Sequence, residues 1–117
     1  QMQSFAEGFT VLKNAPYAYD LAKVAGLLNV GSVIESRLIG WAKSGYEKHG
    51  EDLEGISGTV GHTGEGKWTV ETAKKMGIPV PVIEASYTFR VDSEKNPSYT
   101  GQVLSMLRNQ FGGHSTK

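Results

Sequence analysis

The stretch MQSFAEGFTVLK, residues 2–13, indicates the fold class of this 117-residue chain. Its apolar side chains recur at steps of three and four residues, at Met2, Phe5, Phe9 and Leu12. This spacing places them on one side of an α-helix, because successive helical residues are rotated by about 100°. The stretch therefore predicts an amphipathic helix that ends near Lys13, since Asn14 and Pro16 follow.

The same kind of signal continues toward the middle of the chain. Asp20 is suited to cap a second helix, which Gly31 is placed to close. Ser32 and Glu35 have the spacing of a capping box, in which each side chain accepts a hydrogen bond from the other residue's backbone. We therefore expect a third helix to begin there and to run to about Lys48. The apolar residues expected on this helix are Val33, Ile34, Leu38, Trp41 and Ala42.

Three further helices are expected in the second half of the chain. Thr69 is suited to cap a fourth helix that runs through Lys75. Prolines open the next two helices, at Pro81 and Pro97, because a proline fits the first helical turn. Glycines that can adopt left-handed backbone angles end the fourth and sixth helices, at Gly77 and at Gly112 and Gly113.

No segment alternates apolar and polar residues for long enough to predict a β-sheet. Between Gly50 and Gly66 six glycines interrupt the chain, which predicts a long irregular loop. A chain of this length suits one hydrophobic core. We therefore predict one all-α domain over residues 1–117, with about six helices and a glycine-rich loop.

The composition excludes several classes of function. Twelve basic residues balance twelve acidic residues, so the chain lacks the broad positive charge that nucleic-acid binding needs. No apolar run approaches the roughly 20 residues of a membrane span. The chain has no cysteine, which excludes disulfides and thiolate chemistry and fits a cytoplasmic protein. Because the first residue, Gln1, already lies in a helical pattern, we expect a fragment of a longer protein.

The loop GHTGEGKWT, residues 61–69, nearly matches a nucleotide-binding P-loop. Such a loop needs a hydroxyl that ligates magnesium after its lysine, and Trp68 occupies that position here. A P-loop also follows a buried strand, whereas residues 53–60 contain three polar residues and two glycines among eight. Many donors before a helix N-terminus still favour a small anionic ligand. The alternative is that the glycines only turn the chain and that Lys67 is solvated.

The C-terminal stretch RNQFGGHSTK, residues 108–117, is a second candidate site. Arg108 can bind a carboxylate or a phosphate through two parallel hydrogen bonds, and His114 follows a flexible glycine pair. The alternative is a frayed terminus with incidental charges. Arg90 is a further candidate on the fifth helix, with a surface arginine whose stem packs down as its alternative.

Taken together, these segments resemble the decarboxylating 6-phosphogluconate dehydrogenases, in their shorter-chain form. The most specific matches are GEGKWT at residues 64–69 and RNQFGGH at residues 108–114. The others, in the same order along the chain as in the family, are AEGFTVLKNAPYAYDL (6–21), GSVIESRL (31–38), ISGTVGHTGEGKWTVETA (56–73) and GIPVPVI (77–83). The resemblance covers most of the chain.

The resemblance implies a fragment of the helical C-terminal domain of a two-domain dehydrogenase. The family oxidises 6-phosphogluconate at C3 and decarboxylates the keto acid to ribulose 5-phosphate, in the pentose phosphate pathway, without a metal. NADP or NAD binds mainly to an N-terminal Rossmann domain, which is absent here. The family's general base, a lysine, and general acid, a glutamate, lie just upstream of the segment that matches residues 1–5. We therefore expect no catalytic residue in this chain.

The resemblance also implies a set of substrate-binding residues, namely Thr63, Gly64, Glu65, Arg90, Arg108 and His114. It assigns Arg90 to the phosphate, and it implies a homodimer in which Arg108 and His114 reach the neighbouring subunit's active site. The chain departs from the family at two of these positions, because longer-chain members have lysine at Thr63 and threonine at Glu65. Glu35 stands where relatives usually have arginine. An alternative function is a non-catalytic helical assembly domain of a related hydroxyacid dehydrogenase.

Overall fold

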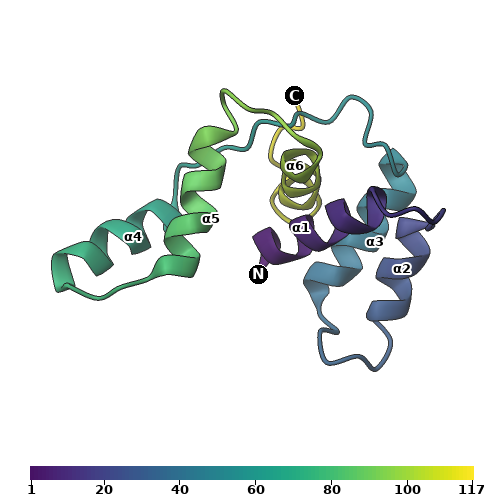
Figure 1. Ribbon diagram of the computed structural model, residues 1–117, viewed down its shortest axis with the longest axis horizontal. Coiled ribbons are helices and arrows are strands. Elements are labelled where there is room, and N and C mark those ends of the chain that lie inside the picture. The colour runs from purple at the N-terminus through teal and green to yellow at the C-terminus, as the bar shows by residue number, and fades with distance from the viewer.

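The computed structural model describes residues 1–117 as six α-helices without a strand, which confirms the prediction of an all-α domain. The helices are α1 (Met2–Lys13), α2 (Leu21–Leu28), α3 (Arg37–His49), α4 (Glu65–Met76), α5 (Pro81–Asp92) and α6 (Tyr99–Gly112). Four of them, α1, α2, α3 and α6, form a bundle, and α4 and α5 extend from it as a hairpin (Figure 1). No helix is both long and apolar enough to cross a lipid bilayer.

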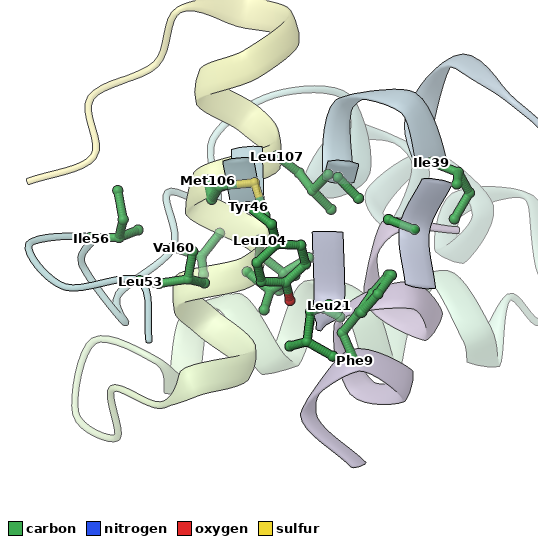
Figure 2. Packing of buried hydrophobic residues seen from close by; sticks show 14 residues of the cluster. Phe9, Leu21, Ile39, Tyr46, Leu53, Ile56, Val60, Leu104, Met106 and Leu107 are labelled. Atoms are coloured by element: carbon green, nitrogen blue, oxygen red, sulfur yellow. The ribbon is translucent and has the colours of Figure 1, made fainter. Parts of the chain in front are cut away.

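The hydrophobic core lies within the bundle and against the irregular segment after α3 (Figure 2). Helix α6 is its centre, because residues from Thr100 to Leu107 are buried except for Gln102. The largest fully buried side chains include Leu21, Ile39, Leu53, Leu104, Met106 and Leu107. Arg108 follows this buried segment directly, so the most firmly packed helix of the fold positions it.

Helix α6 also holds the glycine-rich segment in place. A side chain at Gly101 would bring its Cβ within 1.8 Å of the carbonyl oxygen of Gly58, so the loop backbone lies directly against the helix. The hydroxyl of Ser105 donates a hydrogen bond of 3.0 Å to the carbonyl of Thr59. The amide of Gln102 donates to two further loop carbonyls. The loop is therefore irregular in its backbone angles but fixed by hydrogen bonds.

The expected capping box at residues 32–35 is wrong. Helix α3 begins later, at Arg37, and its N-cap is Ser36, whose hydroxyl accepts a hydrogen bond of 3.3 Å from the third residue of the helix. The Glu35 carboxylate instead accepts a hydrogen bond of 2.8 Å from the backbone of Gly31, which closes the turn after α2. Val33 and Ile34, which were predicted to lie on the third helix, belong to this turn instead and are exposed.

The expected starts of two other helices are displaced. Helix α4 begins earlier than predicted, at Glu65, because Gly64 is its N-cap and has a φ of 124° that favours glycine. Thr69 lies inside the helix, where its hydroxyl donates to the Glu65 carbonyl. Helix α6 is capped by Ser98 rather than opened by Pro97. Other predicted boundaries are confirmed, namely the cap Asp20, the start at Pro81 and the left-handed residues Gly77 and Gly113.

The α4–α5 hairpin is less buried than the bundle. Its two helices pack mainly against each other, and α5 has no buried residue. Several large apolar side chains on the hairpin are exposed, including Trp68, Met76, Ile78, Val82 and Ile83. One side of the hairpin faces α6 and the start of α1, and the candidate site lies there.

Candidate functional site

A cleft of about 280 Å³ is lined by residues of the α4–α5 hairpin, the glycine-rich loop, α6, the C-terminal tail and the first turn of α1. Five of the six predicted substrate-binding residues line it, Thr63, Glu65, Arg90, Arg108 and His114. The sixth, Gly64, is not in its lining and serves as the N-cap of α4. The structure therefore brings together the glycine-rich loop, the fifth helix and the tail, which the sequence presents as three separate candidates.

The most informative feature of the cleft is its pair of arginines. Arg90 on α5 and Arg108 on α6 are both half-buried, and neither guanidinium has a salt bridge or a hydrogen-bond acceptor within the chain. Burial, and then the positive charge of Arg108, lower the pKa of Arg90. Partly buried cations are ordinarily paired, since leaving water without a partner is costly. The arrangement therefore favours an anion between the two arginines.

Gly61 explains how Arg108 reaches this position. A Cβ at Gly61 would lie 2.7 Å from the Nη1 atom of Arg108, so the guanidinium rests against loop backbone where no side chain intervenes. The sequence indicates Gly61 only as the first glycine of a near-miss P-loop. Its contact with a residue of α6 is visible only in the folded chain.

The start of α4 adds to the positive potential of the cleft. Helix α4 has no side-chain cap at its N-terminus, and its first residues Glu65, Gly66 and Lys67 line the cleft. Uncapped N–H groups and the helix dipole favour an anion at this end. The Nζ atom of Lys67 is 3.9 Å from the Glu71 carboxylate, and both side chains are half-exposed. Surface ion pairs of this kind contribute little to stability. The carboxylate of Glu65 would repel an anion. Glu65 differs in this respect from the other predicted substrate-binding residues.

The tail folds back onto its own chain. The side-chain amide of Asn109 donates a hydrogen bond of 2.9 Å to the carbonyl of His114. The carbonyl of Thr116 accepts one of 2.6 Å from the backbone N–H of Ser57. These contacts argue against the alternative of a frayed terminus. The expectation that the tail enters a neighbouring subunit's active site stays a prediction.

The cleft also contains residues that the sequence did not single out as ligand contacts, including Lys67, His62 and Tyr87. The Nε2 atom of His62 lies 2.7 Å from a carboxylate oxygen of Glu94, a residue 32 positions away that follows α5. No local pattern in the sequence joins these two residues. No group of three or more histidine, aspartate and glutamate side chains could hold a metal ion.

These features define an all-α domain with a cleft whose charges favour a small anionic ligand. The cleft is concave, its two guanidinium groups have no protein partner, and a helix N-terminus faces it. An arginine pair of this kind suits ligands that carry phosphate or carboxylate groups, because the guanidinium geometry matches both.

Comparison with known proteins narrows this class. No family model matches the chain. The chain is 43% identical over 116 residues to YqeC of Bacillus subtilis (strain 168), which carries a provisional 6-phosphogluconate dehydrogenase name; the match covers 99% of the chain and 39% of YqeC. It is 34% identical over 113 residues to the NAD(+)-dependent, decarboxylating 6-phosphogluconate dehydrogenase of Haloferax volcanii. This match covers 97% of the chain and 38% of that enzyme. It is 33% identical over 122 aligned positions to the decarboxylating 6-phosphogluconate dehydrogenase of Synechocystis. This match covers 96% of the chain and 25% of that enzyme.

The chain belongs to the 6-phosphogluconate dehydrogenase family and corresponds to the C-terminal part of its members. The family resemblance inferred from the sequence is thereby confirmed. The chain spans only about two fifths of the length of the first two relatives.

Proposed function

We propose that residues 1–117 form the substrate-binding and dimerisation part of an NAD(P)-dependent oxidative decarboxylase that converts 6-phosphogluconate to ribulose 5-phosphate. The observation that carries this proposal is the meeting of two unpaired arginines, Arg90 and Arg108, in one cleft with Thr63 and His114. Family membership led us to expect a sugar-phosphate acid at these residues, and the electrostatics of the cleft independently favour an anion.

The proposed ligand matches the charges of the cleft. 6-Phosphogluconate has a phosphate at one end and a carboxylate at the other, and each can accept two parallel hydrogen bonds from a guanidinium. Arg90 binds the phosphate in this proposal, as the family resemblance implies. The first-turn N–H groups of α4 and the side chain of Lys67 supply further donors. Glu65 is best placed to accept a hydrogen bond from a hydroxyl of the sugar, because it would repel either anionic end.

The catalytic groups are proposed to come from residues upstream of this chain. Met2, in the first turn of α1, lines the cleft, so the start of this helix lies beside the ligand. The family's lysine base and glutamate acid lie just before the matching segment, and a base must come within hydrogen-bond reach of the proton that it removes. We expect no turnover from residues 1–117 alone.

The cofactor is assigned mainly to a separate N-terminal domain. The chain has no strand, and so it lacks the strand–turn–helix unit that binds a dinucleotide in Rossmann domains. The helical residues therefore do not fit NADP or NAD by themselves. When bound, the cofactor accepts the hydride from the substrate, and the helical part holds and orients that substrate.

The exposed apolar side chains of the hairpin support a role in dimerisation. Trp68 is 61% exposed, Met76 65% and Val82 73%, although all three are large and apolar. Trp68 and Met76 line one groove together with Ile78 and Val80. Exposed apolar patches mark interaction sites in many proteins. A homodimer is the proposed assembly. The same surface also fits the alternative of a helical assembly domain without a substrate of its own.

Calorimetric titration of the chain with 6-phosphogluconate tests the proposal. Replacing Arg108 with alanine should cost about 1.5 to 3 kcal/mol of binding free energy, because a charged hydrogen bond is lost. Arg37→Ala is the matched control, since Arg37 is an exposed arginine outside the cleft. Equal affinity of wild type and Arg108→Ala would remove Arg108 from the site. A chain that dimerises in sedimentation experiments but binds no 6-phosphogluconate would support the assembly alternative.

A further inference from the structure

Three side chains that line the cleft carry a hydroxyl group, Thr63, Ser86 and Tyr87. Thr63 is already one of the predicted substrate-binding residues. The hydroxyl of Ser86 is engaged, because it donates a hydrogen bond of 2.9 Å to the carbonyl of Val82 in the preceding turn of α5. Tyr87 is half-buried, and its hydroxyl makes no hydrogen bond within the chain and is accessible to solvent. The fold itself therefore leaves the hydroxyl of Tyr87 available to a ligand.

Tyr87 lies on the side of α5 that faces the cleft. Ile83 and Arg90, one turn before it and one turn after it, line the cleft as well. Residues three or four positions apart are neighbours on a helix surface, with about 5 to 6 Å between their Cβ atoms. Tyr87 and Arg90 are therefore side by side on one helix, and a group that binds the guanidinium of Arg90 lies close to the phenol.

The ring of Tyr87 is held from one side by His62. The two rings meet edge-on, with 6.1 Å between their centres and an angle of 74° between their planes. The Nε2 atom of His62 lies in turn 2.7 Å from a carboxylate oxygen of Glu94. These contacts limit the freedom of the phenol ring before a ligand binds, which lowers the entropic cost of ordering it in a complex. They involve the ring of Tyr87 and leave its hydroxyl free.

The neighbouring charges indicate which group the phenol binds. Arg90 and Arg108 are donors only, so a molecule that binds between them supplies acceptors. A phosphate group has three terminal oxygens, and a guanidinium that binds through two parallel hydrogen bonds uses two of them. The third oxygen can accept the hydrogen that a tyrosine hydroxyl donates. A carboxylate has only two oxygens, and the same guanidinium would occupy both.

We propose that the hydroxyl of Tyr87 donates a hydrogen bond to the phosphate of the bound sugar acid, beside Arg90. This role rests on the proposed function, because it takes Arg90 as the arginine that binds the phosphate. Tyr87 is then a specificity-determining residue of the cleft. Arg90 by itself binds a phosphate or a carboxylate, whereas Arg90 and Tyr87 together favour the group with three acceptor oxygens.

The variant Tyr87→Phe tests this role, because it keeps the ring and removes only the hydroxyl. In NMR titrations of the chain, it should weaken binding of 6-phosphogluconate roughly three- to tenfold. The thermal midpoint should be unchanged, since the hydroxyl has no partner within the chain. Tyr17→Phe is the matched control, because Tyr17 is an exposed tyrosine outside the cleft, and it should leave the affinity unchanged.

A double variant tests the placement at the phosphate. In an Arg90→Met background, Tyr87→Phe should cause a smaller loss of affinity than in the wild type, because both side chains hold one phosphate. Equal losses in the two backgrounds would overturn that placement, and unchanged affinity of the single variant Tyr87→Phe would overturn the contact itself. Failure of the wild-type chain to bind 6-phosphogluconate would instead refute the proposed function, and the role of Tyr87 with it.

Discussion

Replacing Gly61 with alanine should weaken ligand binding without weakening the fold. The new Cβ would lie 2.7 Å from the Nη1 atom of Arg108, which is closer than a carbon and a nitrogen tolerate without a bond. The atom that must move is the end of a flexible side chain, so the backbone can stay in place. Gly61 does not have the positive φ that would strain an alanine. The predicted effect is a displaced guanidinium in an otherwise unchanged chain.

The size of the effect can be bounded from the contacts. Complete loss of the charged hydrogen bonds of Arg108 costs about 1.5 to 3 kcal/mol. Displacement retains part of that interaction, so we expect Gly61→Ala to cost about 1 kcal/mol, or roughly fivefold in affinity. The free energy of unfolding should be unchanged or higher by up to about 1 kcal/mol, because alanine restricts the unfolded chain more than glycine does.

Calorimetric titration with 6-phosphogluconate and urea unfolding measure the two quantities. Gly8→Ala is the control, because Gly8 is an exposed helical glycine with open space around it. It should stabilise the chain and leave the affinity unchanged. In the double variant, Gly61→Ala should add almost nothing to Arg108→Ala, since both act through one guanidinium. Additive losses in the double variant, or unchanged affinity in Gly61→Ala, would refute this account of Gly61.

Three further changes test the fold and the site. Arg90→Met should lower affinity for 6-phosphogluconate at least tenfold in calorimetry but keep the thermal midpoint, since the guanidinium has no protein acceptor; a large fall in the midpoint would contradict this. Gly101→Ala should lower the unfolding free energy by about 1 to 3 kcal/mol in urea, because its Cβ would meet a backbone oxygen at 1.8 Å; an unchanged midpoint would contradict that contact. A hydrogen bond from the backbone N–H of Lys23 lowers the pKa of Asp20 below its ordinary value of 3.8, so its stabilising effect is present above that value and is lost as the pH falls through the folded-state pKa. Asp20→Asn keeps the cap and should show a smaller loss of stability in acid than wild type; equal losses would exclude Asp20 as a contributor.

The sequence predicts the helices well because the signals that define them are local. Spacing of apolar residues, a capping aspartate and left-handed glycines each act within one or two turns. The wrong helix starts lie where two local signals compete. Ser32 and Ser36 are both good caps, and the hydrogen bond from Gly31 to Glu35 decides between them. Thr69 is a good cap too, but Gly64 adopts backbone angles that start the helix sooner.

The sequence indicated single residues of the candidate site but not how they come together. Arg108 was identified within a resembling segment, and Arg90 as a candidate on the fifth helix that matches an arginine of the family. Their meeting in one cleft depends on how α5 lies beside α6. The pair of His62 and Glu94 joins residues 32 positions apart, and nothing in either neighbourhood indicates the other. The contact of Gly61 with Arg108 is likewise a product of tertiary packing.

The two walls of the cleft are anchored very differently. Arg108 extends from a helix at the centre of the core, whereas Arg90 and Lys67 belong to a hairpin that few contacts hold to the bundle. A ligand that bridges the walls therefore acts as a brace for the hairpin. If the opened form does not bind the ligand, binding raises the free energy of local opening by RT ln(1 + [L]/Kd), where [L] is the concentration of free ligand. Amide hydrogen exchange in α4 and α5 should consequently slow as ligand is added, while exchange deep in α6 changes least.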